Sequence, residues 1–105
     1  MRVQIDGVYS VRASTPVKPG KDYHLVLEKL GWVMIDGRRE QQPLTMAIYA
    51  SQVLLVRDLV SDTIGRQVLH GKMNTIASYV SETRRIAELA QIALDELNRL
   101  QAKNV

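Results

Sequence analysis

Residues 75–103 read TIASYVSETRRIAELAQIALDELNRLQAK, and this stretch decides the fold that we expect. It contains neither Pro nor Gly, and mostly apolar side chains recur every three or four residues. The recurring positions form one stripe: Ile76, Val80, Thr83, Ile86, Ala90, Ala93, Leu97 and Leu100. A spacing of about 3.5 residues is typical of a helix with a coiled-coil-like seam. Leu89 and Ile92 widen the apolar side, which indicates packing against more than one neighbour.

A second helix is predicted upstream, from about Leu44 to Leu69. Pro43 suits the first turn of a helix, where its missing N–H is not needed. The pattern weakens at Gly71, which could end this helix while Asn74 caps the next one. The alternative is one continuous helix with a weak point at Gly71. The sequence thus predicts two long helices, arranged as a hairpin or as one broken rod.

The N-terminal part reads as a small β layer. Asp6-Gly7 lies between two β-branched runs and predicts a two-residue hairpin turn, because Gly adopts a positive φ freely and Asp tolerates it. Trp32–Ile35 reads as a short strand. It ends at a second Asp-Gly pair, residues 36 and 37, which we also interpret as a change of chain direction.

The segment between these strands is ambiguous. One helical face is present in residues 23–30: Tyr23, Val26, Leu27 and Leu30. However, Tyr23, Leu25 and Leu27 also alternate as in a strand. We favour a short helix here. Residues 12–22 precede it and contain Pro16, Pro19 and Gly20, which predict an exposed loop.

Together these elements predict an α+β chain that is mainly helical and forms a single domain. Residues 1–42 would form a small β-rich layer that includes the hairpin, and residues 43–105 the helical region. The chain has 105 residues, an apolar share of 46% and no Phe. Such an aliphatic composition suits packing of helices against each other.

Composition excludes several classes of protein. The chain has no Cys, so it can form no disulfide, thiolate zinc site or cysteine nucleophile. The first residues lack an apolar h-region, and Pro43–Val60 is interrupted by charged side chains. We therefore expect neither a cleavable signal peptide nor a membrane span. The expected location is the cytoplasm, or a larger particle or secretion assembly.

Residues that could carry catalysis or bind a metal are sparse. Each Asp-Gly pair offers a single carboxylate, whereas a calcium loop needs several oxygen ligands in a short span. His24 and His70 stand far apart and outside any metal-binding spacing. Ser78 and Ser81 have no general base within reach on their helix. We therefore expect no catalytic, cofactor-binding or metal-binding residues, and the protein is not expected to be an enzyme.

The predicted helices have more apolar surface than the small β layer can cover. This surplus favours burial in a homo-oligomer or against another helical protein. The expected function is thus that of a non-enzymatic assembly or interaction protein, in a secretion or phage-type assembly for example. The residues expected to carry the contact are apolar: Leu54, Leu55, Leu59, Ile76, Ile86, Leu89, Leu97 and Leu100.

The alternative is a small nucleic-acid-binding regulator. Its phosphate contacts would come from Arg66, Lys72, Arg84 and Arg85. The balance of 14 basic and 11 acidic residues gives a net charge of +3 without a basic block. This charge neither demands nor excludes a nucleic-acid partner.

One family resemblance follows the order of these segments. VQIDG (residues 3–7), a loop, Pro43-Leu44 and GKMNTIASYVSETRRIAELAQIALDELNRL (residues 71–100) occur in a layout similar to the C-terminal part of type III secretion needle-tip and filament proteins. In that family the terminal helix pairs in a long coiled coil. The resemblance implies a role in assembly or host contact and transfers no functional residue.

Overall fold

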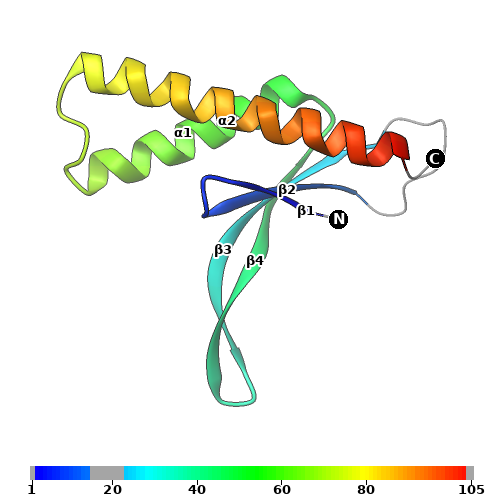
Figure 1. The fold of residues 1–105 in the computed structure, drawn as a ribbon. Helices are drawn as coiled ribbons and strands as arrows, with labels where there is room; N and C mark the ends of the chain where they lie inside the picture. The colour runs from blue at the N-terminus through cyan, green and yellow to red at the C-terminus, as the bar shows by residue number, and fades with distance from the viewer. Residues whose placement is uncertain (1, 15–22, 104–105) are drawn as a thin grey trace.

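A computed structural model describes residues 2–14 and 23–103 (Figure 1). The loop predicted around Pro16, Pro19 and Gly20 lies outside these residues. The order of elements is β1 (Arg2–Ile5), β2 (Tyr9–Ala13), β3 (Leu25–Ile35), β4 (Arg38–Tyr49), α1 (Gln52–Leu69) and α2 (Ile76–Lys103). The strands form one 4-stranded antiparallel sheet in the order β1-β2-β3-β4.

The predicted fold class is therefore wrong in its proportion of helix to strand. The chain is an antiparallel sheet followed by two helices, and not a mainly helical chain with a small hairpin. Strands β3 and β4 have 11 and 12 residues, and β4 runs across the predicted boundary at residue 43. Pro43 lies within β4 opposite Leu30 and does not start a helix. It is tolerated there because β4 is an edge strand.

The helix favoured for residues 23–30 is also wrong, and the alternating interpretation is the correct one. Leu25 and Leu27 belong to the core beneath the helices, whereas Val26 pairs with Arg12 and Ile48 and lies on the other face. β2 and β4 pair with the two edges of this segment. These non-local hydrogen bonds outweigh the local helical spacing.

Both Asp-Gly pairs are turns in which every Asp and Gly has a positive φ. At Asp36-Gly37 the φ angles are 51° and 79°, and Ile35 pairs directly with Arg38. This is the two-residue connection that a type I′ turn provides. At Asp6-Gly7, Ile5 pairs with Tyr9, so the connection has three residues where two were predicted.

The two predicted helices are separate. α1 ends at Leu69, and Gly71 follows the C-cap His70; the Gly71 N–H donates to Val68 O and the Lys72 N–H to Gln67 O, the two bonds of a Schellman motif. α2 is capped by Thr75, whose Oγ1 accepts a bond from the Ser78 N–H at 3.0 Å. Thr75, and not the predicted Asn74, thus caps the second helix.

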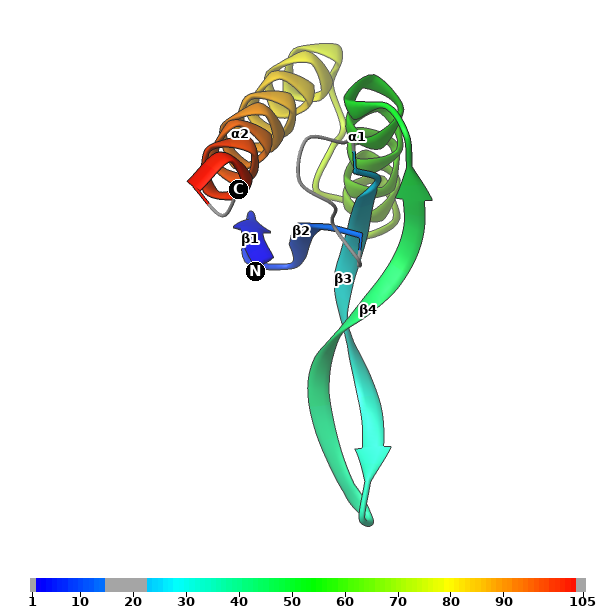
Figure 2. The ribbon, with the colours of Figure 1, turned by 90° about the vertical axis from the view of Figure 1, so that its right-hand side faces the viewer.

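The helices lie side by side over one face of the sheet (Figure 2). α2 contacts β1 and β2, while α1 contacts β3 and β4. Tyr9, Val11 and Leu27 of the sheet belong to the same buried cluster as Leu59 of α1 and Ile86 of α2. The core therefore lies between the sheet and the helical hairpin and includes the middle of the predicted seam.

The two glycines around the end of α1 give a matched test of this geometry. Gly71 has a φ of +67°, so Gly71→Ala should lower the free energy of unfolding by about 1 kcal/mol. Gly65 lies inside α1 with nothing within 4 Å of an added Cβ, so Gly65→Ala should raise it by about 0.5–1 kcal/mol. Urea unfolding measures both. Changes of the same sign would contradict the assigned helix end.

Candidate interaction surface

The outer part of the β3–β4 hairpin projects from the body of the protein (Figures 1 and 2). β2 pairs with β3 only as far as Lys29, and residues 30–44 continue as a two-stranded ribbon, here called the arm. Met46 has no partner on β3, because Leu27 pairs with Ala47 and Glu28 with Thr45. This bulge, which bends a strand locally, lies where the arm leaves the body.

The arm makes the chain extended for its length. The principal extents are 46 × 39 × 18 Å, and the radius of gyration is 15.3 Å. A compact domain of about 100 residues has a radius of gyration of about 13 Å. The outer half of the hairpin is therefore not covered by the described part of the chain.

Large apolar side chains on the arm face solvent. Trp32 is 56% exposed and Met34 is 68% exposed, and both lie on the same face of β3. Ile35 and Leu44, on the other face, are also exposed. Leu44 lies against Gly31, where an added Cβ would be 2.4 Å from Leu44 Cδ1. The β3 half of the arm thus carries apolar side chains on both faces, as in strands that are covered on both sides, whereas residues 38–42 of β4 are polar.

Charged side chains on the arm offset one another. Arg38 and Arg39 follow the turn, and Asp36 and Glu40 carry the opposite charge close by. The Arg39 guanidinium lies over the Trp32 ring, 4.6 Å from its centre. Trp and Arg are the side chains that most often dominate binding energy at protein interfaces.

A second apolar surface lies at the tip of the helical hairpin, beyond the sheet. Its exposed side chains come from the end of α1 and the start of α2: Val68, Leu69, Ile76, Tyr79 and Val80. An open hollow there is lined by Val68, Met73 and Ile76, among others. On α2 the buried core positions begin at Ile86, so this tip extends past the core.

The residues predicted to contact a partner divide into two groups. Four are fully buried in the chain's own core: Leu55, Leu59, Ile86 and Leu97. They cannot face a partner, because the sheet is larger than predicted and covers the seam. Leu89 packs partly against the core, and Leu100 is partly exposed. Leu54 and Ile76 are exposed, and their contact with a partner stays a prediction.

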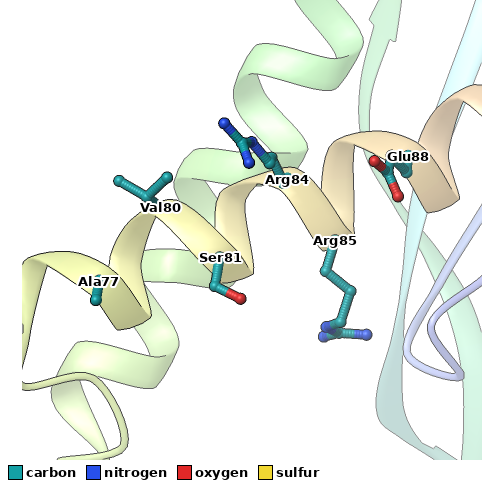
Figure 3. A pocket seen from close by; sticks show the side chains of 6 residues that line it. All are labelled: Ala77, Val80, Ser81, Arg84, Arg85 and Glu88. Atoms are coloured by element: carbon teal, nitrogen blue, oxygen red, sulfur yellow. The ribbon is translucent and has the colours of Figure 1, made fainter.

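The four basic residues of the nucleic-acid alternative do not form one surface. Arg85 donates to both oxygens of Asp6, each at 3.0 Å, and also binds Glu82. The Arg66 guanidinium lies 5.7 Å from the centre of the Tyr9 ring. Lys72 and Arg84 are exposed, but Arg84 points away from Arg85 across α2 (Figure 3). The hollow in that view is lined by residues of α2 alone.

Two acidic residues of α1, one turn apart, hold the helix to the sheet. Asp58 accepts a hydrogen bond of 2.8 Å from the Tyr49 hydroxyl, and burial together with this bond raises the pKa of Tyr49 to about 12. Asp62 accepts from the Tyr9 hydroxyl and from Lys29 Nζ, the latter at 3.0 Å. These pairs were not predicted from the sequence. Their only local signal is two carboxylates at helical spacing in an apolar segment.

Glu82 and Glu28 form further polar contacts between elements. Hydrogen bonds from Arg85 and from Gln67 lower the pKa of Glu82 to about 2. Glu28 accepts bonds from Arg2 and Arg12 on the face of the sheet opposite the helices. These carboxylates are engaged in structural pairs. Within residues 2–14 and 23–103, no group of three His, Asp or Glu side chains could hold a metal ion.

A family described as a domain of unknown function (DUF5405) matches residues 3–98. The chain belongs to this family. The DUF5405 match spans the whole sheet with its arm, α1 and most of α2. The comparisons with curated proteins and with solved structures gave no match. The resemblance to type III secretion proteins thus stays a prediction. No described helix of this DUF5405 chain is long and apolar enough to cross a membrane.

Proposed function

We propose that this protein is a non-enzymatic interaction protein that binds a protein partner through its β3–β4 arm. The observation that carries the proposal is the exposure of Trp32 and Met34 on a ribbon that leaves the core. An isolated two-stranded hairpin is only marginally stable in water. A partner that covers the arm would bury its apolar side chains and stabilise it.

Composition of the arm supports a protein partner over a nucleic acid. Phosphate binding relies on an excess of Lys and Arg, and its strength falls steeply with salt. Two acidic residues, Asp36 and Glu40, offset Arg38 and Arg39 here. The apolar side chains of the arm instead resemble the core of a protein interface, where charged residues are depleted and Trp, Met and Arg are enriched.

Site-specific cross-linking in the cell of origin tests the proposal. A photo-reactive amino acid replaces Met34 on the arm or, as the control, Ile92 on α2, which is 65% exposed. We expect a discrete cross-linked protein product from position 34 and none, or much less, from position 92. Equal products at both positions, or none at position 34, would contradict a role of the arm in binding.

A further inference from the structure

We infer that the partner of the arm is the arm of a second copy of this chain, packed around a two-fold axis with Trp32 at the contact. This inference rests on the proposed function of the arm and adds the identity of its partner. Three observations carry it: the exposed apolar area, the charge of the arm and the unpaired edges of its strands.

The apolar area on the Trp32 face of the arm and its base approaches the apolar part of a dimer interface. The exposed apolar side chains of β3 and β4 are Trp32, Met34, Ile35, Leu44, Met46 and Ile48. With about 200 Å² for a fully exposed large side chain, Trp32, Met34 and Ile48, which share one face, expose roughly 370 Å² per copy. Ile35 and Leu44 lie on the opposite face. A standard interface buries about 800 Å² per partner, a little over half of it apolar.

The charges of the arm allow two copies to meet. The whole chain carries a net charge of +3, so two copies repel each other weakly on average. The arm itself is formally neutral, because Asp36 and Glu40 offset Arg38 and Arg39. An acidic partner would find no excess of positive charge here, whereas an identical arm meets no net repulsion.

The strand edges of the arm point to the same partner. β4 is an edge strand along its whole length, and in the described residues no strand pairs with the outer side of β3 beyond Lys29. Charged side chains and Pro43 make the β4 edge a poor template for pairing, whereas the unpaired outer edge of β3, residues 31–35, is apolar and can pair with another strand. A two-fold axis makes the same surface available on both copies, so each arm covers the other.

The chain's lack of Cys makes a clean test possible. In purified protein, Met34→Cys with a short bifunctional thiol reagent should give a covalent dimer. Ile92→Cys, the matched exposed position, should give little at the same concentration. Light scattering of the unmodified chain should rise from 11.8 kDa to twice that mass with concentration. Trp32→Asp should raise the protein concentration at which the dimer forms by at least 100-fold, with an unchanged circular dichroism spectrum.

Other outcomes would overturn the inference. A chain that stays monomeric at every concentration excludes the second copy. A dimer that persists in Trp32→Asp, without a thiol product from Met34→Cys, uses another surface. If in either case position 34 still cross-links to a different protein in the cell, the proposed function stands and only the identity of the partner is wrong. If Trp32→Asp fails to fold, the comparison of Met34→Cys with Ile92→Cys still shows whether two arms meet.

Discussion

Ile86→Ala is expected to lower the free energy of unfolding by about 3–4 kcal/mol, whereas Ile76→Ala should change it by less than about 0.5 kcal/mol. Both residues lie in the apolar stripe of α2 and both were expected to face a partner. Ile86 is 0% exposed and belongs to the core cluster, and Ile76 is 83% exposed at the helical tip. Truncation at Ile86 leaves a cavity between the helices and the sheet, while truncation at Ile76 removes a solvated side chain.

Urea unfolding of the two variants at low protein concentration measures this difference. The substitution is the same in both variants, so burial is the main difference, with a smaller contribution from the position of Ile76 as the first residue of α2. Nearly equal losses would contradict the placement of the core. A large loss at Ile76 alone would mean that the start of α2 is covered in solution.

Glu28→Gln is expected to lower the free energy of unfolding by about 2 kcal/mol near pH 7. The Glu28 side chain is only 4% exposed and accepts bonds from Arg2 Nε at 2.6 Å and from Ser10 Oγ at 3.1 Å. Gln cannot supply the charge that these donors bind. The expected loss of unfolding free energy is smaller than for a fully buried ion pair, because the Arg2 side chain is 46% exposed and is screened by water.

The cost of Glu28→Gln should depend on pH. The hydrogen bond from Arg2 lowers the pKa of Glu28 below its ordinary value of 4.5. A carboxylate with a lowered pKa in the folded state stabilises fully above its unfolded pKa. This stabilisation is lost as the pH falls through the folded pKa. The difference between wild type and Glu28→Gln should therefore be smaller at about pH 3 than at about pH 7, because below pH 4.5 protonation of Glu28 in the unfolded chain already removes part of the stabilisation.

Glu88→Gln is the control for this experiment, because Glu88 is exposed on α2. It should change the free energy of unfolding by less than about 0.5 kcal/mol at either pH. Asp58, Asp62 and Glu82 also titrate in acid, but they are common to wild type and variant and cancel in the comparison. A difference for Glu28→Gln that is equal at both pH values would contradict the role of its charge.

Local patterns predicted the parts of the fold that local interactions determine. The stripe of residues 75–103 predicted α2 to within a residue at its start, and a helix end at Gly71 was one of the two alternatives that the sequence left open. The Asp36-Gly37 turn was also recognisable, because only a few residue types adopt two successive positive φ angles. Each of these features depends on residues within one or two turns of the chain.

The length of the hairpin was missed although Trp32–Ile35 was expected as a strand, because residues 38–42 are all polar and β3 shows no alternation. Trp32 and Met34 lie on one face and Val33 and Ile35 on the other, and all are apolar, so the period of two that marks a half-buried strand is absent. The apolar run after Pro43 then read as the start of α1. The signal that remained was one-sided, since β-branched and aromatic residues precede Asp36-Gly37 whereas the polar residues 38–42 follow it.

Four of the residues expected to face a partner were misplaced for the same reason. Without β3 and β4 at full length, the helices had more apolar surface than the rest of the chain could cover. The observed sheet covers Leu55, Leu59, Ile86 and Leu97. Apolar side chains that remain exposed lie instead on the arm and at the helical tip. Because the lengths of β3 and β4 were underestimated, these four buried residues were expected to face a partner.

Fluorescence of Trp32 tests the central claim most directly, because it is the chain's single tryptophan and lies on the arm. As the purified protein is concentrated, its emission should shift to shorter wavelength and become protected from acrylamide quenching, in step with the doubling of mass. Emission typical of a fully hydrated indole at every concentration, with unchanged quenching, would show that no second copy covers the arm.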